Sequence, residues 1–114
     1  MAVTEPDISR GRMPAEEREC RSRLAQLMTQ RGLMRGTLQV RMRLCGRANC
    51  KCTRGERHRS LYLVVSENGR YRQLFVPRDW ESRVREWVRD YGRAKGLLEK
   101  LSRRYWKKVE EREV

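Results

Sequence analysis

Residues 44–58 read LCGRANCKCTRGERH, and the rest of the chain is organised around this stretch. It holds three of the four cysteines and the only histidine of the 114-residue sequence. The spacing C-x4-C-x-C-x5-H places three thiols and one imidazole within a short segment. A tetrahedral Zn²⁺ site requires four ligands of these types. The stretch therefore predicts a zinc knuckle whose ligands are Cys45, Cys50, Cys52 and His58.

The pattern leaves the fourth ligand and the metal open. Cys20 could replace His58 if its own helix folds back over the loop. His58 is favoured because closing a short loop costs less entropy than closing a long one. The three cysteines could also be inert or redox-active thiols, or could hold copper or an iron–sulfur cluster.

The stretch also resembles an uncharacterised family of small bacterial and archaeal proteins, often found near mobile elements. The core of that family runs C-G-x3-C-x-C-x2-G-x2-H-G-P-Y-Y, followed by a hairpin and an arginine-rich helix. The matching residues here are Cys45, Gly46, Cys50, Cys52, Gly55, His58 and Tyr62. The resemblance covers about residues 36–101, and it departs at Arg59 and Ser60, where the family has Gly-Pro. It implies a shared fold, a metal knuckle and a function linked to DNA.

The chain is strongly basic, with a formal net charge of +13 and 28 basic residues, of which five are lysine. A protein with this balance usually binds a polyanion: DNA, RNA or, less often, an anionic membrane surface. Arginine suits paired hydrogen bonds to phosphate and to guanine. A GC-rich genome would also raise the arginine content. The composition predicts nucleic-acid binding, and DNA is favoured over RNA.

Basic residues gather around the predicted metal loop. A rigid knuckle would present them to phosphates, while Arg47 and Asn49 could reach base edges. The alternative is that they form a solvated rim. The predicted nucleic-acid-binding residues are Arg41, Arg43, Arg47, Asn49, Lys51, Arg54, Arg57 and Arg59.

Three segments between residues 36 and 78 have strand patterns. Residues 37–44 alternate apolar and polar side chains, and residues 60–66 are apolar on both faces, which suits a central strand. Asn68 and Gly69 predict a tight hairpin before the return strand 71–76. We expect a three-stranded antiparallel meander over residues 36–78, with the metal loop 45–58 between its first two strands.

The aromatic residues of these strands have two interpretations. Tyr62, Tyr71 and Phe75 could form core beneath a helix, which is the favoured one because aromatic residues generally pack strands. They could instead form a platform on which single-stranded bases stack.

One helix is expected before the sheet region in the sequence and another after it. Residues 1–14 read as a disordered leader, and residues 15–35 as an N-terminal helix that begins after Pro14. Residues 79–112 read as one long helix, although Gly92 and Gly96 could divide it. Its first half should cover one sheet face, and its second half should pack on the first helix or on another copy. The apolar steps of four and three fall at Trp80, Val84, Trp87, Tyr91, Ala94, Leu98, Leu101, Tyr105 and Lys108.

These patterns predict an α+β protein that is not an enzyme. A three-cysteine, one-histidine set is typical of closed structural zinc sites, and Glu56 is the one candidate for a general base beside it. The N-terminus has no apolar run of the kind found in signal peptides or membrane spans, so a cytoplasmic location is expected. The alternative function is an adaptor that works through the C-terminal helix, as a homodimer or with a recombinase or transposase.

Overall fold

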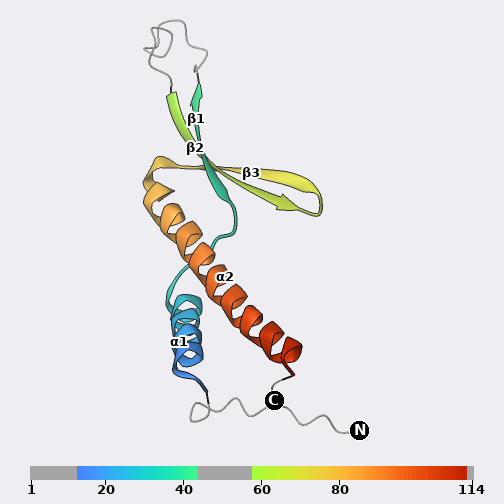
Figure 1. Cartoon of the computed structure of the whole chain (residues 1–114). Helices are drawn as coiled ribbons and strands as arrows, with labels where there is room; N and C mark the ends of the chain where they lie inside the picture. The colour runs from blue at the N-terminus through green and yellow to red at the C-terminus, as the bar shows by residue number, and fades with distance from the viewer. Residues whose placement is uncertain (1–12, 44–57, 113–114) are drawn as a thin grey trace, which may run out of the picture. The chain divides into compact units, whose positions relative to one another are not determined.

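The computed structural model describes residues 13–43 and 58–112 (Figure 1). This part of the chain forms α1 (Ala15–Gln30), β1 (Thr37–Arg43), β2 (His58–Glu67), β3 (Arg70–Val76), a 3₁₀ turn η3 (Arg78–Trp80) and α2 (Glu81–Glu110). The predicted α+β arrangement of a first helix, a three-stranded antiparallel sheet and a long last helix is confirmed. The predicted zinc knuckle falls mostly on residues 44–57, outside the described residues.

The chain divides into two compact units. The helical unit contains α1 and the part of α2 from Gly92 onward, and the sheet unit is residues 33–91. α2 is one helix, whose residues up to Tyr91 belong to the sheet unit and whose residues from Gly92 onward belong to the helical unit. The two glycines of α2 therefore do not break it. Within residues 13–43 and 58–112, no helix is long and apolar enough to cross a membrane.

The sheet is an antiparallel meander in the order β1-β2-β3. Its register aligns Gln39, Tyr62 and Phe75 across the three strands. The β2–β3 turn has positive φ at both Asn68 (51°) and Gly69 (76°). Two consecutive positive φ angles match the twist of a tight hairpin, which is why Asn-Gly serves at this position.

The core of the sheet unit lies on one face of the sheet. Leu61 is fully buried, and Leu63, Val76 and Val84 are nearly so. Val84 belongs to α2, and Trp87 of the same helix packs against this cluster. The first half of α2 therefore covers this sheet face, as predicted. The other partly buried hydrophobic residues that pack against the cluster are Met34, Leu38 and Val88.

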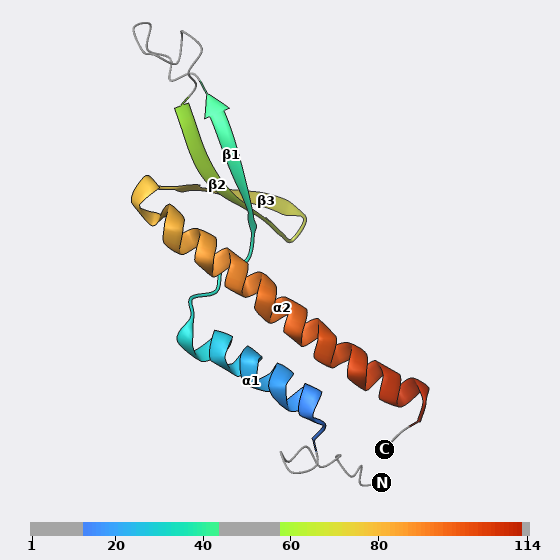
Figure 2. The same cartoon turned by 60° about the vertical axis from the view of Figure 1, so that its left-hand side comes forward.

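The helical unit has its own small core. Cys20 of α1 and Ala94 and Leu101 of α2 are buried, and the Cys20 thiol donates a hydrogen bond to the Leu97 carbonyl at 3.4 Å. The second half of α2 thus lies against α1 (Figure 2), which is one of the two predicted arrangements. Leu98, although part of the predicted apolar stripe, is 59% exposed.

A buried carboxylate joins the two helices of this unit. The Glu17 side chain is 2% exposed, and its Oε2 accepts hydrogen bonds of 2.9 Å from Arg21 Nε and from the Tyr105 hydroxyl. Arg21 Nη2 also donates to the Tyr105 oxygen at 2.9 Å. Burial opposes ionisation of Glu17, but the hydrogen bonds from Arg21 and Tyr105 outweigh it and hold the pKa of Glu17 below its usual value.

This network predicts how stability depends on pH. Because the pKa of Glu17 is lower in the folded chain than in the unfolded chain, its contribution is complete above the ordinary carboxyl pKa of about 4.3 and declines as the pH falls. Glu17→Gln should cost about 1–3 kcal/mol at neutral pH, and this cost should shrink in acid. Urea unfolding of both proteins between pH 7 and pH 3 measures it. A cost that stays constant over this range would contradict the assignment.

A second prediction concerns Gly36, whose backbone lies close to the Leu63 side chain just before β1. Gly36 has φ 151°, and a Cβ at this position would lie 2.6 Å from Leu63 Cδ1. Gly36→Ala should therefore destabilise the protein by about 1–3 kcal/mol. Gly92→Ala is the matched control, because a Cβ there meets nothing within 4 Å and alanine favours helix by up to about 1 kcal/mol. Thermal unfolding should move in opposite directions for the two variants.

Candidate nucleic-acid interface

The predicted metal ligands lie largely outside the described residues. Cys45, Cys50 and Cys52 belong to residues 44–57, while His58 opens β2 with an exposed side chain and pairs with Arg43 in the β1–β2 ladder. Cys20 is 4% exposed because its side chain is packed between α1 and α2, where the thiol donates to the Leu97 carbonyl. Among residues 13–43 and 58–112, no three histidine, cysteine, aspartate or glutamate side chains form a group that could hold a metal. The zinc site stays a prediction.

The predicted nucleic-acid-binding residues divide in the same way. Arg47, Asn49, Lys51, Arg54 and Arg57 lie outside the described residues. Arg41 and Arg59 lie on neighbouring strands, where Arg41 pairs with Ser60 and Arg59 pairs with Met42. Side chains alternate between faces along a strand, so these two arginines project from opposite faces of the sheet.

Arg59 is held against α2. Its Nη1 lies 3.1 Å and 3.2 Å from the two carboxylate oxygens of Glu81. The charge of Arg59 is thus balanced on the sheet face that α2 covers. Arg41, in contrast, projects from the other face.

We call this other face the outer face. In the ladder, Thr37 aligns with Val64 and Gln73, Gln39 aligns with Tyr62 and Phe75, and the remaining positions follow by alternation. The residues of the outer face whose side chains the structure describes are Thr37, Gln39, Arg41, His58, Ser60, Tyr62, Val64, Ser66, Tyr71, Gln73 and Phe75. No carboxylate belongs to this set.

Arg41 is fixed at the centre of the outer face by groups that carry no charge. Its guanidinium carbon lies 4.2 Å from the centre of the Tyr62 ring, which is a cation–π contact. Its Nη1 donates to Gln73 Oε1 at 2.8 Å and its Nη2 donates to Gln39 Oε1 at 3.1 Å. These contacts orient the guanidinium without neutralising it, so the positive charge remains available to an anion.

Three aromatic residues share this face with Arg41: Tyr62, Tyr71 and Phe75. The Tyr62 and Phe75 rings meet edge to face with centroids 5.7 Å apart. Phe75 is 52% exposed and Tyr71 is 78% exposed. The favoured expectation that these aromatic residues lie beneath a helix is therefore wrong for Phe75 and Tyr71. The helix covers the opposite face, because that face carries Leu61, Leu63 and Val76.

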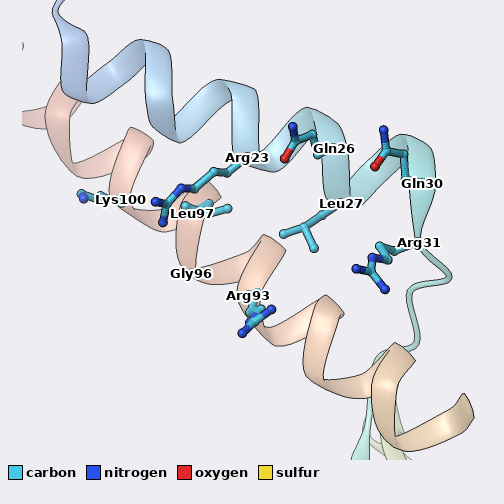
Figure 3. Close-up of a pocket in the computed structure, with 9 residues that line it drawn as sticks. All are labelled: Arg23, Gln26, Leu27, Gln30, Arg31, Arg93, Gly96, Leu97 and Lys100. Atoms are coloured by element: carbon cyan, nitrogen blue, oxygen red, sulfur yellow. The ribbon is translucent and has the colours of Figure 1, made fainter.

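The helical unit has a second basic surface, a cleft between α1 and α2 (Figure 3). The cleft measures about 600 Å³, with Leu27 and Leu97 between the helices. Figure 3 shows basic side chains from both helices along its length. The four basic residues that line it are Arg23, Arg31, Arg93 and Lys100, and no acidic residue is part of its lining.

Sequence reasoning missed the two glutamines and the cleft. Gln39 alternates with Leu38 and Val40, and Gln73 follows Arg72, so neither glutamine carries a local signal that marks it as a partner of Arg41. The available signal was their placement on the same face as Arg41, which needs the register of all three strands. The cleft depends on which faces of α1 and α2 meet, and the spacing of Arg23 and Lys100 within separate helices does not carry that information.

Comparison with known proteins places the chain in a family. No curated protein and no solved structure gives a significant match. A family model described as Domain of unknown function (DUF6788) matches residues 13–86. The match agrees with the resemblance to an uncharacterised family, and it extends over α1, the sheet and the start of α2. Because it covers more than half of the sequence, this chain belongs to the DUF6788 family.

Proposed function

We propose that the protein binds nucleic acid, DNA in preference to RNA, through the outer face of its sheet and the neighbouring segment 44–57. One observation carries the proposal: Arg41 is fixed between an aromatic ring and two amide oxygens on the sheet face opposite α2, and no carboxylate is among the described residues of that face. A guanidinium held in this way is preorganised for a phosphate or for the edge of guanine.

The charge distribution supports the proposal. The net charge of +13 attracts polyanions at long range. Several acidic side chains form ion pairs with arginines of this chain; examples are Glu17, Glu67 and Glu81. These carboxylates neutralise arginines other than Arg41. In the described part of the chain, no carboxylate belongs to the outer face and none lines the cleft of the helical unit, where Arg23 is paired with Glu19.

The predicted zinc knuckle adds a second part to this interface. If Cys45, Cys50, Cys52 and His58 hold zinc, the metal would fix the backbone between β1 and β2. The basic residues of the segment would then extend the surface that begins at Arg41 on β1. Metal binding would contribute directly to folding of this segment, as it does in small zinc modules.

The family resemblance suggests the setting. A small nucleic-acid-binding protein near mobile elements fits an accessory of a recombinase or a transposase. The alternative, an adaptor that works through α2, has less support, because Val84, Ala94 and Leu101 of its apolar stripe are buried within this chain. A partner that needed this stripe would have to displace the sheet or α1.

Replacement of Arg41 tests the proposed interface. Arg41→Ala should weaken binding to DNA about tenfold at moderate salt and should lower the slope of log affinity against log salt by about 1, because one phosphate contact is lost. Arg85→Ala is the matched control: it removes the same charge from the exposed side of α2 in the same unit. Fluorescence anisotropy with labelled DNA measures both. Equal losses in the two variants would mean that diffuse charge, and not the outer face, drives binding.

Elemental analysis tests the metal. Protein purified without added metal should contain about one zinc per chain, and Cys45→Ser should abolish it. His58→Ala should lower the zinc content, whereas Cys20→Ala should leave it unchanged, since Cys20 is packed between α1 and α2. Metal-free protein with freely reactive thiols would contradict the knuckle. Loss of zinc in the Cys20 variant alone would move the fourth ligand to that cysteine.

A further inference from the structure

We propose that the outer face binds single-stranded nucleic acid by stacking unpaired bases on Phe75 and Tyr71, with Arg41 holding the backbone or a base edge between them. The inference rests on the proposed function and names its substrate class. Phe75, Gln73 and Tyr71 occupy alternate positions of β3, so a ring, an amide and a second ring follow one another along one strand.

The exposure of these rings carries the inference. Phe75 and Tyr71 are 52% and 78% exposed, although each could bury substantial apolar area in a core. Stacking on an aromatic side chain requires the flat face of a base, and in a duplex these faces are occupied by the neighbouring base pairs. Exposed rings on a basic sheet therefore suit unpaired bases.

The polar groups of the outer face complete a binding surface. Because Gln39 and Gln73 give their side-chain oxygens to Arg41, the amide nitrogen of each remains as a donor. Tyr62 lies beneath Arg41 and beside Phe75, which fixes the position of both side chains. Rigid rings and fixed donors reduce the entropy that binding would cost.

A second copy of the chain fits this face less well than a nucleic acid does. Two outer faces packed together would bring the Arg41 guanidinium of each copy into a surface whose described residues include no carboxylate. Burial of a charge without an opposite partner is strongly unfavourable. A polyanion supplies both the flat apolar groups and the negative charge that this face lacks.

Three DNA ligands distinguish the contribution of base stacking to affinity from the contribution of phosphate charge. These are a single strand of about 12 nucleotides, an abasic strand with the same phosphates, and a duplex of the same sequence. Binding is measured by fluorescence anisotropy on the full chain at about 0.2 M salt, where phosphate contacts contribute less. The intact single strand should bind tighter than both the abasic strand and the duplex.

The variants keep apolar volume and remove the ring. Phe75→Leu and Tyr71→Leu should each weaken binding of the intact strand about 5- to 100-fold and leave binding of the abasic strand unchanged. Phe75→Tyr should retain the affinity of the unaltered protein. Leu74→Ala is the control, because Leu74 is 51% exposed on the same strand but projects from the opposite face.

Several results would overturn the inference. If the leucine variants bind normally while Arg41→Ala weakens binding, charge contacts alone operate, and the proposed function survives without stacking. An equal loss for Leu74→Ala would show that loosening of the sheet, and not stacking, lowers affinity. A change in self-association alone, seen by sedimentation, would assign the face to a second copy. Absence of binding to every DNA ligand would remove the proposed function as well.

Discussion

A three-stranded sheet has two faces, and among its described residues the sheet unit of this chain has one α-helical segment, the first half of α2, with which to cover them. Leu61, Leu63 and Val76 lie on one face and pack with Val84 of the helix. Side chains alternate along each strand, so this choice places Tyr62 and Phe75 on the other face. The outer face is therefore a direct consequence of how the core forms, and the placement of Arg41 follows from the same alternation.

The distribution of ion pairs explains why the positive charge of Arg41 stands out in so basic a chain. Glu81 lies against Arg59 on the covered face, and Glu17 lies against Arg21 in the helical unit. The Arg59–Glu81 pair lies near the surface and contributes little stability, whereas Glu17 is buried, but both pairs decide where net charge remains. Arg41 is oriented by Tyr62 and by amide oxygens, none of which carries a formal charge. These contacts orient the guanidinium as an ion pair would, but they do not neutralise its positive charge.

The sequence predicted the elements better than it predicted their faces. The alternation of residues 37–44, the Asn68-Gly69 turn and the stripe of residues 79–112 each carry a local signal, and all three elements are present. In β3, however, Tyr71 and Phe75 alternate with Leu74 and Val76, so both faces look partly apolar. Which face is covered depends on β2 and α2, and no local pattern contains that information. The predicted metal motif of residues 45–58 is the strongest local signal in the chain, yet the predicted ligands Cys45, Cys50 and Cys52 lie outside the residues that the structure describes.

The apolar stripe of α2 is typical of a coiled coil, and the structure gives it another cause. Val84 and Trp87 pack against the sheet, whereas Ala94 and Leu101 are buried in the helical unit. A helix that serves two small cores in succession needs apolar residues at the same spacing as a helix that pairs with one long partner. Leu98 of the stripe belongs to neither core and is 59% exposed. Val84, Trp87, Ala94 and Leu101 of the stripe are thus used within the chain, whereas Tyr71 and Phe75 of the outer face belong to neither core and stay exposed.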